Sequence, residues 1–330
     1  MSEPVVAEHP DPPPIEESAA SPAGSTEPPR RRRLRWWQGT LALVLGGFVA
    51  QAAQLVVVVA AVLLTIGRFQ GPITPGALQP HLEELLTSFE VLGPAVVVTG
   101  LMMVLVAMAT PRLARVRVGD ALGLRKAPWP VFVAAPLGIL ALGPTSDAMR
   151  QLMEAVAPNL TFDTLEGLDE LARSAPLWMV LPVMALVPGL SEEMLFRGLF
   201  QRSIARAWLA LPLSAVLFAC YHLDPHHVVA VLPLGFYLAW LGQRTGSLWV
   251  PVTAHVANNA AAVLASVYLI DPLAGEPEPS EWWWVPAGWA LAIPCIVVVW
   301  WVTRREGAAP ERADERMTRA TVAAPPGGPG

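Results

Sequence analysis

The sequence predicts an all-α, polytopic membrane protein with about eight transmembrane helices around a central bundle. Hydrophobic residues make up 54% of the 330 residues and charged residues only 15%, and the mean hydropathy is positive. A soluble globular chain is nearer a quarter charged. Several apolar runs are also long enough to cross a hydrocarbon core, which takes about 20 helical residues.

Residues 1–35 predict a disordered tail that ends in a basic membrane anchor. They are rich in Pro, Glu, Ala and Ser without apolar periodicity, and they lack the start of a cleavable signal peptide. Five arginines between positions 30 and 35 are followed by Trp36 and Trp37 and then by an apolar run. A nucleic-acid patch is the alternative for such a basic run, but a place directly before a span favours a cytoplasmic anchor. We therefore expect the lipid bilayer, and no nucleic acid, as a partner.

Eight apolar stretches follow, within an expected transmembrane domain of residues 36–305. They lie near 38–66, 91–109, 130–145, 176–190, 209–223, 228–242, 248–270 and 283–302, the fourth continuing as a charged helix to about 205. The tail 306–330 has no apolar pattern, so we expect it to be disordered. Met149, Leu152 and Leu168 belong to helical patterns within 146–174, which predict surface helices on the outer interface, as an ordinary connection rather than a substrate gate.

The charges of the connecting loops alternate from one side to the other. Loop 111–128 holds five basic residues, whereas 67–90, 146–174 and 271–281 are acidic on balance. Further arginines lie on the same predicted side as loop 111–128: Arg202, Arg206, Arg244, Arg304 and Arg305. Basic loops stay in the cytoplasm. We therefore expect an integral protein of a bacterial inner (plasma) membrane with both termini cytoplasmic.

The segment Ser191–Gly198 places Glu192, Glu193 and Arg197 in an otherwise apolar helix. A charged side chain at mid-bilayer costs roughly 2.5 to 3.5 kcal/mol on insertion scales. Glu193 and Arg197 are four residues apart in the favourable order for an ion pair. Glu192 is rotated from Glu193 by about 100°, so it needs partners from elsewhere. The alternative is a structural polar cluster that locks helices together.

Polar residues on the next spans can supply those partners. Phe218 and His222 are four apart, and a later span carries His255 with Asn258 and Asn259. A single histidine in an apolar helix is more often a structural hydrogen-bonding residue. Groups on three neighbouring spans, however, can satisfy one another only by converging, since lipid offers no partner.

Two further histidines, His226 and His227, follow Asp224-Pro225 at a loop or helix end, and we leave them outside the site. Cys220 and Cys295 both lie in apolar segments and predict no disulfide.

A glutamate and a histidine that converge around a water are what a hydrolase needs. The carboxylate takes a proton as the water attacks a carbonyl, and an imidazole orients the water or donates to the leaving amine. Histidine and asparagine donors can hold the developing oxyanion. The polar residues on the three spans therefore favour hydrolysis.

The three motifs Glu192-Glu193-x-x-x-Arg197, Phe218-x-x-x-His222 and His255-x-x-x-Asn259 resemble those of the CPBP family of CAAX prenyl proteases and bacteriocin-processing or self-immunity proteins. The match covers about 175–265. The resemblance implies an intramembrane endopeptidase with Glu192 and His222 as the water-activating pair. It also implies His255 and Asn259 as oxyanion donors, with Glu193, Arg197 and Phe218 in support.

The family has been regarded both as metal-dependent and as glutamate-dependent without a metal. The chain has no H-E-x-x-H pair, which would fix two metal ligands one helical turn apart. We therefore expect no cofactor. A single zinc-like divalent ion on Glu192, His222 and His255 is the alternative.

Two other functions remain as alternatives to an endopeptidase of membrane-associated peptides or proteins. A non-catalytic binding or immunity protein would use the same polar cluster, and a transporter would use its ionisable groups as an ion path. The motifs do not distinguish a prenylated substrate from another. The boundaries above place Glu192 toward the cytoplasmic half of the membrane and His222 near the outer end of its span. A break at Pro188-Gly189, or a shifted or tilted span, would reconcile the two depths.

Overall fold

The structure, a computed structural model, describes residues 33–69, 74–160, 164–269 and 282–322. These residues form helices and no strand, which confirms the predicted all-α membrane fold. The elements, with η marking π-helical turns, are α1 (Trp36–Arg68), α2 (Pro75–Thr87), α3 (Phe89–Leu113), α4 (Val118–Leu122), α5 (Val131–Ala141), α6 (Gly143–Val156), α7 (Thr164–Arg173), α8 (Leu177–Leu181), η1 (Pro182–Leu186), α9 (Val187–Glu193), η2 (Met194–Gln201), α10 (Ala207–Cys220), α11 (Pro225–Thr245), α12 (Trp249–Tyr268) and α13 (Trp284–Val322).

Within these residues, seven helical segments are long and apolar enough to cross a membrane, one fewer than the eight expected. The exception is α10, whose 14 residues span about 21 Å at 1.5 Å per residue, against a hydrocarbon core of about 30 Å. The chain starts a new helix early, because Asp224 accepts a hydrogen bond from the His226 amide at 3.0 Å and Pro225 occupies the first turn of α11. Leu223, in the turn between them, has a left-handed φ of 64°. α10 then pairs with α11, which returns the chain to the side where α10 began.

The connection after α5 differs from the expectation of separate surface helices. α5 and α6 together form one apolar segment, Val131–Val156, that is long enough to span a membrane. Arg150 forms ion pairs with two acids of α6 itself, Asp147 at 2.7 Å and Glu154. α7 remains a separate short helix that docks on the end of α12, where Arg173 donates to the Ser266 carbonyl at 2.7 Å.

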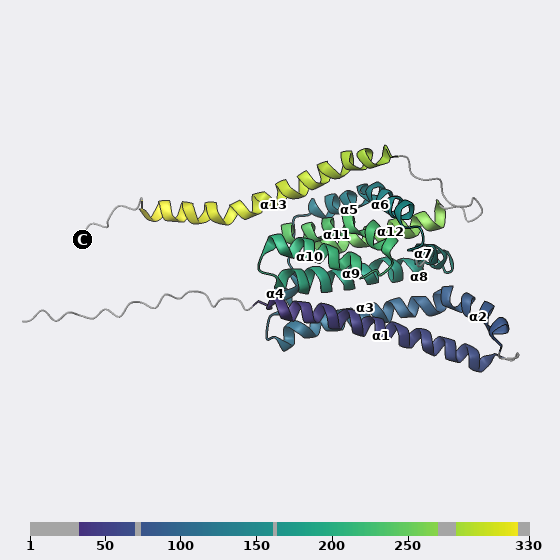
Figure 1. The fold of residues 1–330 in the computed structure, drawn as a ribbon. Helices are drawn as coiled ribbons and strands as arrows, with labels where there is room; N and C mark the ends of the chain where they lie inside the picture. The colour runs from purple at the N-terminus through teal and green to yellow at the C-terminus, as the bar shows by residue number, and fades with distance from the viewer. Residues whose placement is uncertain (1–32, 70–73, 161–163, 270–281, 323–330) are drawn as a thin grey trace, which may run out of the picture. The chain divides into compact units, whose positions relative to one another are not determined.

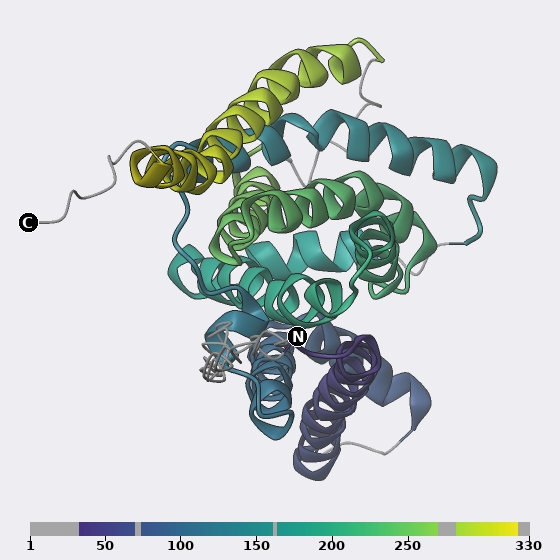
Figure 2. The ribbon, with the colours of Figure 1, turned by 90° about the vertical axis from the view of Figure 1, so that its left-hand side faces the viewer.

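The motif-bearing helices lie between two groups of helices (Figures 1 and 2). α1 and α3 pack against each other and against η2 on one side, while α5, α6 and α13 pack on α11 and α12 on the other. Small residues line the buried face of α1: Gly39, Ala42, Gly46 and Ala50. At Gly39 an added Cβ would lie 2.1 Å from the Ser203 hydroxyl, so α1 approaches the end of η2 at backbone distance. The result is a central bundle with helices on both sides.

The loops predicted to be cytoplasmic lie together. The guanidinium of Arg202 donates to the Gly246 carbonyl at 3.1 Å, and the Ser247 hydroxyl donates to the Arg125 carbonyl at 2.6 Å. Segments that follow α4, η2 and α11 therefore meet at one end of the bundle. The cationic residues of these loops are gathered on a single side, as the charge pattern predicts.

Exposed tryptophans mark both ends of the spans. Those at the basic end are Trp36, Trp37, Trp129, Trp208, Trp249, Trp300 and Trp301, and those at the other end are Trp178, Trp282, Trp283 and Trp284. Tryptophan is enriched at both membrane–water interfaces. The two groups therefore support the boundaries of the spans.

The last helix is longer than the predicted span. Its apolar part is Trp284–Arg304, and the backbone stays helical to Val322. Residues 306–322 are rich in Ala, Glu and Arg, which favour helices. The helix thus enters the segment 306–330 that we expect to be disordered. Most of the N-terminal tail, residues 1–32, and the final residues 323–330 lie outside the described residues.

Candidate active site

The charged segment lies on one continuous helical span, Leu177–Gln201, made of α8, η1, α9 and η2. Wider π turns begin at Pro182. Proline lacks the amide hydrogen that an α-helix uses, and π turns are frequent at functional sites. The break considered at Pro188-Gly189 does not occur, because the backbone is helical through both residues.

The approach of α9 to α12 is closest at Gly189. A Cβ on Gly189 would lie 2.6 Å from the Val256 Cγ2 atom and 3.1 Å from the Val256 amide nitrogen. Real Cβ atoms essentially never come as close as 2.6 Å to another atom, and the backbone contact would also be tight, so a larger residue at position 189 would force Val256 to shift. Val256 follows His255 directly. The missing side chain at Gly189 therefore brings His255 to the charged segment.

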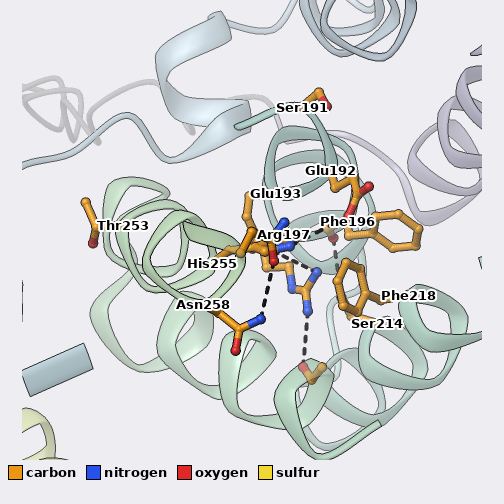
Figure 3. Close-up of polar contacts among 12 residues, drawn as sticks. Ser191, Glu192, Glu193, Phe196, Arg197, Ser214, Phe218, Thr253, His255 and Asn258 are labelled. Atoms are coloured by element: carbon orange, nitrogen blue, oxygen red, sulfur yellow. Dashed lines mark hydrogen bonds and ion pairs between the residues drawn. The ribbon is translucent and has the colours of Figure 1, made fainter. Parts of the chain in front are cut away.

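Glu193 is the centre of a buried ion network. Its Oε1 atom lies 3.0 Å from Arg197 Nη1 and 3.0 Å from His255 Nδ1. The Glu193 side chain is 0% exposed and that of Arg197 only 1%. Figure 3 shows the Glu193 carboxylate with Arg197 and His255 as its partners. The structure therefore contains the predicted ion pair, and His255 extends it to α12.

Arg197 is held from two further sides. Its Nη2 atom donates to the Gly235 carbonyl of α11 at 3.1 Å, and its Cζ atom lies 4.1 Å from the centre of the Phe218 ring. A guanidinium over an aromatic face is attracted by the ring's charge distribution. Phe218 thus supports the cation through its π face, while the Gly235 contact ties η2 to α11.

Glu192 points away from this network (Figure 3). Its Oε2 atom lies 3.9 Å from His255 Nε2, too far for a hydrogen bond. That oxygen is buried and has no hydrogen-bond partner among the described residues. The second carboxylate of the motif therefore keeps one oxygen available.

The hydrogen bonds decide where both histidines carry their protons. His255 Nδ1 faces the Glu193 carboxylate, and His222 Nδ1 lies 3.0 Å from the Phe218 carbonyl oxygen. A carbonyl or an ionised carboxylate can only accept, so each Nδ1 carries the hydrogen. In its neutral form each ring then has a bare, accepting Nε2.

Phe218 links His222 to His255, which in turn approaches Glu192, so the expected difference in depth does not place Glu192 and His222 in separate parts of the bundle. The Phe218 ring centre lies 5.2 Å from that of His222 and 5.5 Å from that of His255. The same phenyl ring therefore contacts both histidines. The reason is the early end of α10, which leaves His222 inside the bundle rather than at the outer end of a full span.

Asn259 lies one helical turn after His255. Its amide donates to the Met184 carbonyl of η1 at 3.4 Å, and its oxygen accepts from the Asn258 amide at 3.3 Å. Both distances are long for such bonds. The structure places Asn259 on the face of α12 toward η1, beside the network rather than within it.

Two residues outside the predicted set pack against His222. The His227 ring centre lies 4.5 Å from that of His222, and the Tyr221 ring centre lies 6.5 Å away. His226, by contrast, is buried and bonded through Nε2 to the Ala157 carbonyl at 2.9 Å, which fits a structural role. The sequence signal that could have placed Tyr221 near the site is its position next to His222. For His227 the signal is the Asp224-Pro225 helix start, because the chain reverses direction there.

A metal would need three ligands close together. Over the described ranges, no three His, Cys, Asp or Glu side chains lie close enough to hold a metal ion. Glu192 approaches His255, and Phe218 packs against both His255 and His222, but the three side chains do not form a ligand cage. The arrangement is a carboxylate beside one imidazole, with a second imidazole against the same phenyl ring, which suits proton transfer to and from a bound water.

Comparison with known proteins adds two matches. Residues 174–261 match the family model described as "Type II CAAX prenyl endopeptidase Rce1-like". Over 105 residues the chain is 27% identical to a Bacillus subtilis (strain 168) protein named "Putative membrane peptidase YdiL", which covers 31% of this chain and 42% of that protein. The chain thus spans less than half the length of this relative. No solved structure matches it. The family match covers the segment that carries the three motifs.

Proposed function

We propose that this chain, which belongs to the CPBP family over residues 174–261, is an intramembrane endopeptidase acting on a membrane-associated peptide or protein. One observation carries the proposal: Glu192 keeps a buried oxygen without a partner in the described structure, 3.9 Å from His255 Nε2. Two polar atoms at that distance can share one water at hydrogen-bond length from each. A peptidase needs a water held by a base at such a place.

In the proposed reaction Glu192 takes a proton from the water while the water oxygen attacks the peptide carbonyl carbon. The proton then passes to the leaving nitrogen as the C–N bond breaks. His222, with a bare Nε2, orients the water by accepting a hydrogen bond. His255 and Asn259 are the proposed donors to the oxyanion, a role that requires a proton on His255 Nε2.

Glu193 and Arg197 support this chemistry by position. The Glu193 carboxylate holds His255 Nδ1 at 3.0 Å and is itself neutralised by Arg197. Because Arg197 is already engaged with Glu193, Gly235 and Phe218, it does not close over the Glu192 oxygen. The network therefore gives Arg197 to Glu193 and leaves Glu192 without an arginine partner.

The proposal is tested with Glu192→Ala. We expect peptide cleavage to fall about 10²- to 10⁴-fold, the usual contribution of a general base, with thermal unfolding unchanged. The measurement compares membrane peptides from cells that carry the intact protein with those from cells that carry the variant. Glu154→Ala, which removes a carboxylate on α6, is the matched control and should cleave normally.

Glu192→Gln separates the endopeptidase from the alternatives. The amide is nearly isosteric but is not a base, so a hydrolase loses cleavage. A binding or immunity protein keeps its phenotype with this variant. A transporter would show ion flux in vesicles that depends on Glu192, without cleaved peptides. Cleavage that persists in purified Glu192→Ala protein would exclude the proposal.

The proposed reaction uses no cofactor. A zinc-like divalent ion on Glu192, His222 and His255 remains the alternative, and a chelator distinguishes the two. Undiminished cleavage after chelation supports the metal-free reaction. Loss of cleavage that zinc restores would replace it with a metal-dependent one.

We further propose a bacterial inner membrane with both termini in the cytoplasm. The support is the single basic end of the bundle, where Arg202 contacts Gly246 and Ser247 contacts Arg125. Tags on each tail that resist protease added from outside the cell would agree with this orientation. The family model's name suggests a prenylated substrate, and cleavage of matched peptides with and without the lipid group measures that preference.

A further inference from the structure

One end of the bundle carries a large excess of positive charge. The start of α1, the loops around α4, the end of η2 and the turn after α11 meet there. Within residues 33–40, 112–128, 202–208 and 244–249 the sequence has one acid, Asp120, which lies 3.8 Å from Arg125. The same segments hold ten basic residues: Arg33, Arg35, Arg112, Arg115, Arg117, Arg125, Lys126, Arg202, Arg206 and Arg244. This end therefore attracts anions.

Arg202 differs from an ordinary loop cation, because the packed backbone fixes its guanidinium. Topology alone requires only that basic residues be numerous on one side of the membrane. Arg202, however, is partly buried, and its Nη1 atom donates to the Gly246 carbonyl at 3.1 Å. An added Cβ on Gly123 would lie 2.6 Å from the same Nη1 atom and 2.7 Å from Cζ. The guanidinium thus lies directly against the loop that follows α4.

That loop is shaped around the guanidinium. Gly123 has a left-handed φ of 71°, which other residues adopt only at a cost. Its carbonyl accepts hydrogen bonds from the Leu248 amide at 2.9 Å and from the Arg125 amide at 2.7 Å. The Ser247 hydroxyl then donates to the Arg125 carbonyl at 2.6 Å. The exposed Arg125 is therefore held two residues from the glycine that Arg202 contacts.

The start of α1 borders the same place. An added Cβ on Gly39 would lie 2.1 Å from the hydroxyl of Ser203, the residue after Arg202. Arg35 lies one helical turn before Gly39, and the exposed Trp36 follows it. Tryptophan is enriched at membrane–water interfaces. The arginines around Arg202 are therefore at the depth of lipid headgroups.

We propose that Arg202, with Arg125 and Arg35 beside it, binds the phosphate group of an anionic phospholipid. The planar guanidinium matches the oxygens of a phosphate with paired N–H donors, and the Gly246 bond takes only one of its five N–H groups. The excess of cations favours a headgroup with a net negative charge over one that carries its own ammonium group. The interfacial tryptophan favours a lipid over a soluble phosphate or a nucleic acid.

The test titrates the full-length protein in detergent with phosphatidylglycerol and measures the dissociation constant by native mass spectrometry. Arg202→Gln and Arg206→Gln remove the same charge from the same segment, but Arg206 is exposed. We expect Arg202→Gln to weaken binding about 10- to 100-fold, as when hydrogen bonds between charged groups are lost. Arg206→Gln should weaken it no more than about 5-fold, the contribution of one cation near an anionic surface.

The remaining arms of the experiment identify the ligand. Phosphatidylcholine should bind at least 10-fold more weakly than phosphatidylglycerol, and neither inorganic phosphate nor a short RNA should displace the bound lipid. Arg125→Gln changes an exposed side chain and should fold normally. It should weaken phosphatidylglycerol binding more than Arg206→Gln does, and it decides the matter if Arg202→Gln fails to fold.

Four results would overturn the proposal. Equal losses in Arg202→Gln and Arg206→Gln would mean diffuse attraction without a site. A wild-type dissociation constant in Arg125→Gln would contradict the arrangement around Arg202. Equal affinity for phosphatidylcholine would remove the preference for an anionic lipid. Displacement by inorganic phosphate or by RNA would assign the basic end to a different ligand. None of these measurements depends on peptide cleavage, so they are independent of the proposed endopeptidase function.

Discussion

Two spans of this protein contain clustered charges, and the two clusters differ in where their charged residues find partners. In α6, Arg150 bonds Asp147 and Glu154 of its own helix, and these side chains are 29%, 30% and 42% exposed. In α9 and η2, Glu193 and Arg197 are 0% and 1% exposed and take further partners from α11 and α12. The first cluster is complete within one helix, whereas the second requires three.

The difference lies in the charge that is left over. Every member of the α6 cluster has an opposite charge one turn away. The other cluster has two carboxylates for one arginine, and Glu193 takes the arginine. Glu192 is then a buried acid whose neighbour His255 is already bonded to Glu193. A surplus carboxylate is costly for stability, so its presence indicates chemistry.

Removing Arg197 should have the largest effect. Arg197→Ala leaves Glu193 buried without its cation, which typically costs about 3–5 kcal/mol. Chemical denaturation in detergent measures the loss. The stability of Arg197→Lys should lie between those of wild type and Arg197→Ala, because lysine keeps the charge but loses the planar contact with Phe218. A loss below about 1 kcal/mol in Arg197→Ala would show that the network is not desolvated as the structure has it.

Gly189→Ala tests whether the second cluster depends on the contact between α9 and α12. The new methyl group meets Val256 backbone, and overpacking of this kind costs about 1–3 kcal/mol. We also expect slower cleavage, because His255 moves with Val256. Gly67→Ala in α1, where no atom lies within 4 Å of the added Cβ, is the control and should be neutral or slightly stabilising. Equal behaviour of the two variants would contradict the close contact.

Arg150→Gln should have the smallest effect. Partly exposed ion pairs contribute about 0–1 kcal/mol, so the unfolding midpoint should hardly change and cleavage should remain at the wild-type rate. High salt should reduce even this difference, since exposed pairs are screened. A loss above about 2 kcal/mol would mean that the α6 cluster is as buried as the other.

Much of the fold was predictable because hydropathy and loop charge report it directly. The resemblance to the CPBP family, read from three motifs, was confirmed by the match over residues 174–261. The Glu193–Arg197 pair followed from spacing alone, because residues four apart meet on any helix. Local rules of this kind need no knowledge of neighbouring helices.

Other features depended on packing and were missed. The sequence does not reveal which of two adjacent acids a histidine on another helix will meet, and the π turns rotate the helix further. His255 proves to bond Glu193 while only approaching Glu192. The stretch 209–223 was counted as a full span although its helix, α10, has only 14 residues, and Asp224-Pro225 was read as a loop or helix end without being identified as the start of α11.

The short α10 has a consequence for the lipids beside it. Its 14 residues reach about 21 Å, roughly 9 Å less than a typical hydrocarbon core. A helix of that length that starts at the membrane surface would place the turn at Leu223, which is 69% exposed, at the depth of acyl chains. Backbone at that depth has to be covered by protein or by water, and a bilayer adjusts to a short segment by thinning locally. The protein therefore carries a built-in region of hydrophobic mismatch beside its candidate site. Cleavage rates in vesicles of graded acyl-chain length would measure how strongly the proposed reaction depends on the thickness of the surrounding membrane.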